Sequence, residues 1–262
     1  MNNVFKTDQR EVDFECEKHG KMKLTQHFMA GKWFDVKCPK CSEEQKAKEE
    51  SEQKQREERE KQERRRKMIE GNIGRAMIPS RFKLHSFESF VPKCDKQEKR
   101  KQTCFDYAER FEEMDKLGRC LIFCGKTGTG KTHLSCSIAN HILQKGCTAV
   151  FMSVLDAVGS VKETFTKGSD KTEREAIRWF LNPDLLILDE VGVQFGTDAE
   201  KMILFQIINK RYEEMKPTIL ISNLGAEELK DYVGDRVIDR MRENGGKLLN
   251  FDWQSHRKTR ND

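Results

Sequence analysis

Eight consecutive residues of this chain have the types and spacing that hold a nucleoside triphosphate: Gly125, Lys126, Thr127, Gly128, Thr129, Gly130, Lys131 and Thr132. They match the pattern G-x-x-x-x-G-K-[ST], in which glycines let the backbone curl until successive N–H groups point into one concavity. We expect Lys131 to reach the β- and γ-phosphates and the Thr132 hydroxyl to bind Mg²⁺. The pattern therefore predicts ATP binding.

The residues on either side of this loop support that interpretation. The apolar run Cys120–Cys124 comes directly before it, and an amphipathic stretch follows. A strand, a glycine-rich loop and a helix in this order place the positive end of the helix dipole against the phosphates. A chance match to the loop pattern alone arises roughly once in a hundred chains of this length.

A second apolar run ends in two acids and supplies the other half of the predicted site. Leu185–Leu188 is followed by Asp189 and Glu190. We expect Asp189 to hold the hydration shell of Mg²⁺ and Glu190 to polarise the water that attacks the γ-phosphate. Two acids at this position can also do no more than end the strand. Together with the loop, however, they favour hydrolysis over transfer to a small acceptor.

Asn223 follows a further apolar run, Thr218–Ser222, and is a candidate for binding the attacking water or a γ-phosphate oxygen. A lone asparagine in this position can equally be a turn residue.

Arginines supply the last candidates. Arg236 and Arg240 lie one helical turn apart on the segment Asp235–Arg242, so either could reach the phosphates of a neighbouring subunit. The alternative from spacing alone is a solvated basic face. Arg257 follows the last apolar run and could act within its own subunit.

Short apolar runs that alternate with helical stretches would position these residues. They predict an α/β fold with a parallel sheet between helices, and a nucleotide at the carboxyl ends of the strands. The expected strands are Cys120–Cys124, Thr148–Met152, Leu185–Leu188, Thr218–Ser222 and Leu248–Phe251. The expected helices are Asp106–Lys116, Thr132–Gln144, Val154–Phe165, Thr172–Leu181, Ala199–Glu214 and Ala226–Met241.

Residues 1–42 hold four candidate metal ligands in two pairs: Cys16 with His19, and Cys38 with Cys41. Two residues separate the members of each pair, a spacing typical of a structural zinc knuckle with four protein ligands. The intervening stretch can form a small hairpin. His27 is the rival nitrogen ligand.

Residues 43–67 contain nine acids, ten bases and a single apolar residue, Ala47. Opposite charges recur at helical spacing, as in Glu60 and Arg64, so we expect a solvated helix without a coiled-coil stripe. It would form a linker over residues 43–74, ahead of a nucleotide-binding domain at 75–262. A partner-binding arm is the alternative.

Composition limits the remaining classes. The 262 residues carry a net charge of +5, which permits contact with nucleic acid without requiring it. No apolar run reaches the length of a membrane span and the first residues lack a secretory signal, so we expect a cytoplasmic protein without a membrane partner. Nine cysteines then indicate free thiols and a metal site rather than disulfides.

Taken together, these motifs resemble the DnaC-type bacterial replicative helicase loaders, a family of AAA+ ATPases related to replication initiators and IstB-type transposition helpers. The resemblance covers roughly residues 75–260, from Ile78–Phe82 onward. It rests on Gly125–Thr132, Asp189–Gln194, Thr218–Asn223, the segment Gly234–Arg242 and Phe251–Trp253.

The resemblance implies an ATP-dependent spiral of subunits that opens a hexameric DnaB-type helicase and places it on single-stranded DNA. In such a loader the N-terminal region binds the helicase. Arg240 matches the arginine supplied to the neighbouring subunit, and Arg257 matches the second sensor. Lys162 and Phe165 match positions that contact single-stranded DNA, although Phe165 could instead be a buried helix-end residue.

One departure from the family concerns the N-terminus, because a Cys/His knuckle and a charged helix replace the all-helical region of the best-known loader. Two other functions remain as alternatives. A transposition helper would share the ATPase core, and a non-hydrolysing nucleotide switch would not need Lys131, Asp189 and Glu190 together.

Overall fold

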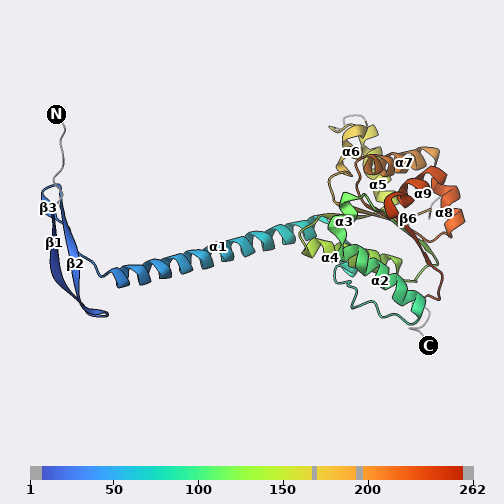
Figure 1. The fold of residues 1–262 in the computed structure, drawn as a ribbon. Coiled ribbons are helices and arrows are strands. Elements are labelled where there is room, and N and C mark those ends of the chain that lie inside the picture. Colours follow the sequence, from blue (N-terminus) through green and yellow to red (C-terminus); the bar gives the residue numbers. More distant parts are fainter. Residues whose placement is uncertain (1–7, 167–169, 193–196, 256–262) are drawn as a thin grey trace. The chain divides into compact units, whose positions relative to one another are not determined.

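The computed structural model describes residues 8–166, 170–192 and 197–255 (Figure 1). These residues form two compact units, which divide between Arg65 and Arg66. Among the described residues, none of the helices is both long and apolar enough to cross a membrane.

The N-terminal unit is built on an antiparallel hairpin. Strand β1 (Asp8–Cys16) pairs with β2 (Gly20–Met29), and the two-residue strand β3 (Lys32–Trp33) adds to β2. One face of the hairpin is apolar, with Val12 opposite Leu24. Sequence analysis predicted a hairpin between the two ligand pairs. Strands β2 and β3 form that hairpin, which is confirmed, although β3 is short. A longer hairpin, which the sequence did not predict, joins β1 to β2 and turns between Cys16 and Gly20.

Helix α1 (Pro39–Arg75) begins inside the second ligand pair, with proline at its first position, where no N–H is needed. The predicted ion pair between Glu60 and Arg64 is present at 3.4 Å, and both side chains are exposed. Such pairs contribute only about 0.3–0.5 kcal/mol each. The sequence stretch 43–67 is thus a solvated helix, as its charge pattern predicted.

The second unit contains a five-stranded parallel sheet in the order β5-β6-β7-β4-β8, and all five predicted strands are confirmed. The strands are β4 (Leu121–Gly125), β5 (Ala149–Ser153), β6 (Leu185–Val191), β7 (Thr218–Ser222) and β8 (Lys247–Phe251). Because the five strands are parallel, their carboxyl ends lie at one edge of the sheet. Strand β4 lies between β7 and β8.

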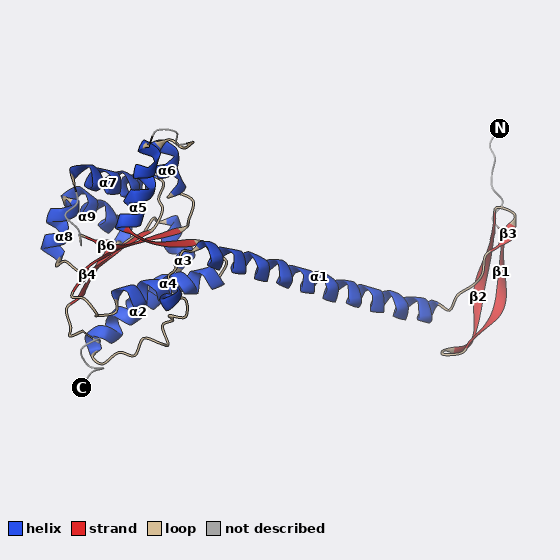
Figure 2. Ribbon diagram, turned by 180° about the vertical axis from the view of Figure 1, so that it is seen from behind, coloured by secondary structure: helices blue, strands red, loops and turns tan. Residues whose placement is uncertain are grey.

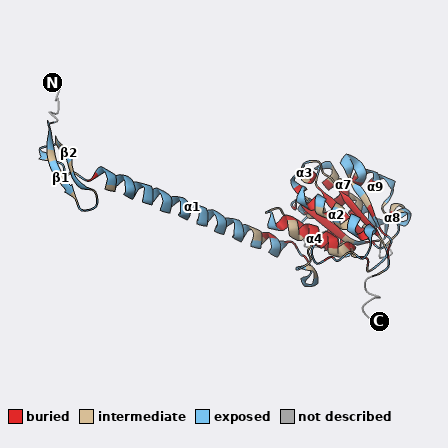
Figure 3. Ribbon diagram, turned by 60° about the horizontal axis from the view of Figure 1, so that its bottom comes forward, coloured by how far each residue is buried: buried red, intermediate tan, exposed pale blue. Residues whose placement is uncertain are grey.

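Helices cover both faces of this sheet, as Figure 2 shows. One face packs against α2 (Asp95–Glu109), α3 (Phe111–Lys116) and α4 (Lys131–Gln144). The other packs against α5 (Val154–Lys162), α6 (Glu173–Trp179), α7 (Asp198–Glu213), α8 (Ala226–Val233) and α9 (Asp235–Arg242). Successive strand residues alternate between the two cores, and buried residues gather in the sheet and on the helix faces against it (Figure 3).

The structure corrects two predicted helices. The stretch Asp106–Lys116 is the end of α2 followed by α3, and α2 already begins at Asp95. The stretch Ala226–Met241 is two helices, because Gly234 has φ +88° and ends α8.

The end of α1 is tied to the outermost strand of the sheet. Asn72 is buried and its side-chain amide donates to the carbonyls of Gly146 and Cys147, at 3.2 and 3.3 Å. One turn later, the Ala76 carbonyl accepts a hydrogen bond from the Phe151 amide of β5 at 2.9 Å. The backbone after α1 therefore continues the sheet's hydrogen bonding by one bond.

Arg211 of α7 is a buried charge that joins the loops at the amino ends of the strands. It is 0% exposed, and its guanidinium donates to the carbonyls of Phe180, Pro183, Asp184 and Pro217 and to the Thr218 hydroxyl, at 2.6–3.1 Å. Burial lowers the pKa of Arg211 to about 10, so it stays charged at neutral pH.

Replacing Arg211 with Ala should lower the free energy of unfolding by at least about 3 kcal/mol, because four buried carbonyls lose their donors. Urea unfolding followed by tryptophan fluorescence measures the change. Lys210→Ala, one residue earlier on the exposed face of α7, is the matched control and should cost under about 0.5 kcal/mol. Equal losses from the two variants would contradict the assignment of Arg211 as a structural hub.

Candidate functional site

The loop that carries the phosphate-binding pattern joins β4 to α4 at the carboxyl edge of the sheet. Its first residue, Gly125, ends β4, and Lys131 begins α4. Both neighbouring strands hold the loop by its backbone. The Gly125 amide donates to the Leu224 carbonyl beyond β7 at 2.9 Å, and the Lys126 amide donates to the Phe251 carbonyl of β8 at 3.2 Å.

Gly125 is a position where only glycine fits. Its φ is +120°, and a Cβ atom built there would lie 2.5 Å from the Phe251 carbonyl oxygen. The close approach of the two backbones at this point fixes where the loop leaves β4, and the next amide, that of Lys126, is held by the same Phe251 carbonyl.

Lys131 is almost fully buried, and its ammonium group donates to loop carbonyls, to Gly125 O at 2.6 Å and Lys126 O at 2.8 Å. Burial lowers the pKa of Lys131 to about 8, although the carboxylate of Asp189 opposes that shift. The side chain is thus a desolvated cation held by two neutral carbonyls. The charged oxygens of a phosphate would accept stronger hydrogen bonds from it.

Thr132 and Asp189 lie in contact. The Thr132 hydroxyl donates to Asp189 Oδ2 at 2.9 Å, while Asp189 Oδ1 accepts from the Glu190 amide at 2.7 Å. Burial raises the pKa of Asp189. A hydroxyl and a carboxylate beside a phosphate-binding loop are the oxygen donors that Mg²⁺ prefers, so this pair fits that ion.

Glu190 has a backbone conformation that is rare for its type. Its φ is +65°, and the pairing of β6 with β7 shifts register between Leu188 and Val191. Such an irregularity re-aims one side chain out of the ladder, and strained conformations of this kind cluster at functional sites. Glu190 is exposed, beside the half-buried Asp189.

Asn223 lies just beyond the acids on the neighbouring strand. It follows Ser222, the residue that pairs with Val191, and it is exposed. The structure therefore brings the tips of β4, β6 and β7 to one edge of the sheet, with Lys131, Thr132, Asp189, Glu190 and Asn223 at or beside them.

Two aromatic residues that sequence reasoning gave no role also touch the loop. The Trp253 indole N–H donates to the Thr129 carbonyl at 3.0 Å. The ring of Phe90 packs so closely that a Cβ on Gly130 would lie 2.5 Å from it. Trp253 belongs to a motif quoted for the family resemblance, whereas nothing in the sequence around Phe90 marks it as a loop contact.

Arg240 lies apart from these residues, on α9. Its guanidinium donates to Asn209 Oδ1 of α7, and no hydrogen bond or ion pair within the described residues joins it to Lys131, Asp189 or Glu190. Arg236 is exposed. Arg257 lies outside the described residues.

The two candidate DNA contacts follow each other on α5 and the turn after it. Lys162 is partly exposed and pairs with Glu200 Oε1 of α7 at 2.7 Å. Phe165 is 57% exposed, so the alternative of a buried helix-end residue is wrong. Both side chains are accessible to a partner, and a phosphate at Lys162 would have to replace Glu200.

In the N-terminal unit the four candidate metal ligands converge. The ligand atoms of Cys16, His19, Cys38 and Cys41 all lie within 4.8 Å of one another. His19 Nδ1 is 3.7, 3.5 and 3.3 Å from the three sulfurs, and Cys16 Sγ is 3.5 Å from Cys41 Sγ. A tetrahedral zinc site with ordinary bond lengths has such edges of about 3.5–3.8 Å. The cluster could therefore bind zinc.

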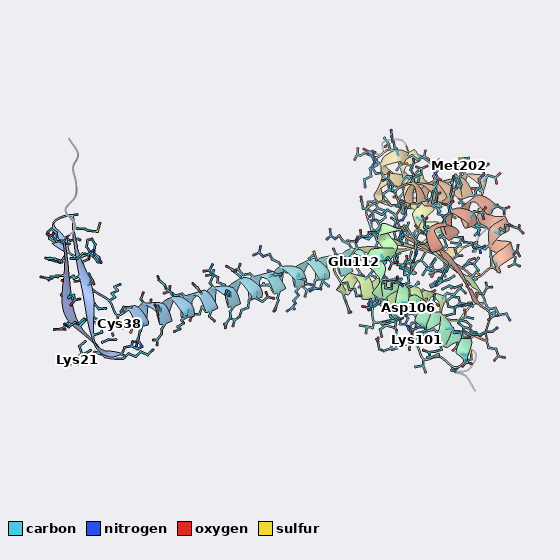
Figure 4. All side chains as sticks on the ribbon, viewed as in Figure 1. Lys21, Cys38, Lys101, Asp106, Glu112 and Met202 are labelled. Carbon is cyan, nitrogen blue, oxygen red and sulfur yellow. The ribbon has the colours of Figure 1, made fainter. Side chains whose placement is uncertain are left out.

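Local structure positions these ligands. Cys16 and His19 flank the turn between β1 and β2, while Cys38 lies immediately before α1 (Figure 4) and Cys41 lies in its first turn. The backbone N–H groups of His19 and Lys18 lower the pKa of Cys16 to about 6, which favours the thiolate that metals bind.

The second ring nitrogen of His19 also has a partner. His19 Nε2 lies 3.2 Å from Glu44 Oε1, the arrangement that commonly orients a metal-binding imidazole. His27, the rival ligand, lies on β2 and is not a member of the cluster.

Comparison with known proteins places this geometry in a family. The model of the IstB-like ATP binding protein family matches residues 22–257. A replicative helicase loader DnaC from Buchnera aphidicola subsp. Baizongia pistaciae is 35% identical over 71% of this chain and 74% of its own. The DnaC of Escherichia coli K12 is 36% identical over 66% of this chain and 69% of its own.

Solved structures agree with the sequence comparison. A crystal structure of the DnaC helicase loader has a TM-score of 0.59 at 25% identity and covers 66% of this chain and 99% of that one. The replication initiator DnaA bound to AMPPCP and single-stranded DNA has a TM-score of 0.55 at 26% identity, over 68% of this chain and 51% of that one. The α/β unit thus has the AAA+ fold of these proteins.

Replacing Gly125 with Ala should weaken ATP binding at least about a hundredfold, because the new Cβ would collide with the Phe251 carbonyl and displace the loop. Equilibrium titration with a fluorescent ATP analogue measures the loss. Gly159→Ala is the matched control, since a Cβ at this helical glycine meets no atom within 4 Å. Native affinity in a folded Gly125→Ala protein would contradict this account of the loop.

Proposed function

Because the chain belongs to the family of IstB-like ATP-binding proteins and closely resembles DnaC helicase loaders, we propose that it hydrolyses ATP to place a replicative helicase on single-stranded DNA. The observation that carries this proposal is the contact between Thr132 and Asp189 beside a buried Lys131. It supplies an ATP site inside a chain whose relatives are named as helicase loaders.

In this proposal each residue at the edge of the sheet has one task. Lys131 leaves the carbonyls of Gly125 and Lys126 and binds the β- and γ-phosphate oxygens of ATP. Thr132 would hold the Mg²⁺ that comes with the nucleotide and Asp189 its hydration shell, and the ion would supply charge neutralisation at the phosphates. The amides of residues 127–132 would provide further donors, since those of Gly125 and Lys126 are taken by Leu224 and Phe251.

Hydrolysis then requires a base at the γ-phosphate. Glu190 accepts a proton from the attacking water as the new O–P bond forms and the bond to the ADP oxygen breaks. Its exposed position at an irregular strand end suits this role, because the carboxylate can face both solvent and nucleotide. Asn223, which directly follows the neighbouring strand β7, would orient the water or a γ-oxygen.

Arg240 completes the site of a neighbouring subunit. Within the described part of this chain, its hydrogen bonds and ion pairs do not reach the ATP residues, which supports action in trans over action in cis. A guanidinium at the γ-phosphate stabilises charge that develops in the transition state. Binding of ATP would thereby link subunits into a spiral. We assign Arg257 the second sensor role from the family resemblance.

Single-stranded DNA would lie against α5. Lys162 offers a cation and Phe165 an exposed ring, the combination on which single strands bind and stack. Contact there would order the junction between subunits and raise ATP turnover.

Residues 1–42, the first part of the N-terminal unit, would bind the helicase, a hexamer of the DnaB type, with residues 43–74 as the linker. Zinc held by Cys16, His19, Cys38 and Cys41 would stabilise this first part, because a hairpin this small buries too little apolar surface to fold securely alone. The apolar face around Val12 and Leu24 is only half-buried and is available for a partner.

A transposition helper is the second candidate, and one observation favours it: the family model that matches most of the chain is that of IstB-like proteins. It would share the ATP chemistry and differ in the protein partner.

The purified protein, mixed with the DnaB-type helicase of its own replicon, should yield a stable complex. ATP should then increase unwinding of a circular single-stranded template with an annealed strand.

Glu190→Gln should still bind ATP while turnover falls at least about a hundredfold, and its helicase loading should fall with it. Retention of a transposase in place of the helicase would support the second candidate. Unchanged hydrolysis in Glu190→Gln would contradict the assignment of the base.

One zinc ion per chain should be found by elemental analysis, and Cys38→Ser should lose it together with helicase binding. ATP binding should remain, since the nucleotide residues lie in a separate compact unit. Cys94→Ser, at an exposed cysteine outside the cluster, is the matched control and should keep its metal. Metal-free native protein that still binds the helicase would contradict the proposal.

A further inference from the structure

Three residues of α7 surround the guanidinium of Arg240. It lies 5.7 Å from the ring centre of Phe205 and 5.3 Å from that of Tyr212, and its Nη1 donates to Asn209 Oδ1. Helices α7 and α9 lie side by side in both ribbon views (Figures 1 and 2). We call Phe205, Asn209 and Tyr212 the arginine cradle.

The spacing of the cradle shows that it is a separate face of its helix. Positions 205, 209 and 212 follow each other at intervals of four and three, so they share one side of α7. All three residues are only half-buried. The core-facing side of the same helix consists of Ile203, Leu204, Ile207, Ile208 and Arg211. The cradle therefore faces α9 at the margin of the core, against which Phe205 also packs.

Further hydrogen bonds fix the cradle itself. Asn209 Nδ2 donates to Glu213 Oε1 at 2.7 Å, so the amide turns its oxygen toward Arg240. The Tyr212 hydroxyl donates to Glu243 Oε2, also at 2.7 Å, and Glu243 directly follows α9. These two hydrogen bonds thus fix the orientation of the Asn209 and Tyr212 side chains.

The cradle leaves part of the arginine available. Within the part of the chain that the structure describes, Nη1 is the only guanidinium nitrogen with a hydrogen-bond partner. Nε and Nη2 keep their donors for another acceptor. The two ring faces attract the cation and carry no formal charge. The carboxylate of Glu213 lies near enough that, after Lys210 and Asn209, Arg240 contributes to lowering its pKa, but Arg240 and Glu213 form no ion pair among the described residues. A carboxylate in place of the rings would compete with phosphate.

We propose that Phe205, Asn209 and Tyr212 are positioning residues that hold Arg240 ready for the γ-phosphate in the next subunit. This inference rests on the proposed function, because it requires Arg240 to act in trans. A flexible arginine would lose several side-chain torsions on reaching a phosphate, and a side chain already held between two rings loses fewer. Within the described residues, the side-chain hydrogen bonds of Asn209 and Tyr212 join them to Arg240, Glu213 and Glu243 and to none of the nucleotide residues, so they act through Arg240.

Mixed assemblies test the proposal. Glu190→Gln subunits bind ATP and donate Arg240 but do not hydrolyse, whereas Arg240→Ala subunits have an intact pocket and no arginine to give. The mixture should recover ATPase activity that neither protein has alone. Adding Asn209→Ala or Tyr212→Leu to the Glu190→Gln partner should reduce that recovery about five- to tenfold.

The same changes in the Arg240→Ala partner are the matched control and should leave recovery within about twofold, because that subunit donates no arginine. Tyr212→Phe, which keeps the ring and loses the bond to Glu243, should restore most of the activity lost in Tyr212→Leu. Asn209→Ala removes only an amide at a half-buried position, so it reports on the cradle even if Tyr212→Leu fails to fold.

If the substitutions reduced the recovered ATPase activity equally in either partner, these residues would have only a structural role in α7. That result would overturn the positioning role of the cradle and leave the proposed function intact. No recovery in the unmodified mixture would overturn the trans arginine of the proposed function, and the cradle with it. The two failures are therefore distinguishable.

Discussion

The contact between the backbones of Gly125 and Phe251 is the constraint on which the nucleotide site depends. Parallel strands bring their carboxyl ends to one edge of the sheet, and β4 lies between β7 and β8. At that edge the backbone of Gly125 lies against the Phe251 carbonyl of β8. The Gly125 amide donates to the Leu224 carbonyl beyond β7. The loop is thus shaped before any phosphate arrives, and the same strand ends deliver the two acids of β6.

Much of this arrangement follows from local patterns. The α/β fold, the five strands and the convergence of the loop with Asp189 could be predicted, because short apolar runs determine strands and strand ends must meet. The early start of α2 at Asp95 could not, since its exposed face is densely charged and resembles a loop. Gly234 marked the break between α8 and α9, yet a glycine within an amphipathic stretch is often tolerated.

Other parts of the site depend on contacts between distant segments. The hydrogen bond from Trp253 to Thr129, the ring of Phe90 over Gly130 and the buried Arg211 join residues that only packing brings together. Arg240 is a further case: helical spacing allowed a solvated basic face, whereas the structure surrounds its guanidinium with two rings and an amide.

The attachment of α1 has a mechanical meaning. The side chain of Asn72 and the carbonyl of Ala76 attach the end of this helix to the region around β5, the outermost strand of the sheet. A force applied to the end of α1 would therefore load these hydrogen bonds beside β5 first, and not the bonds that hold Lys131, Thr132 and Asp189.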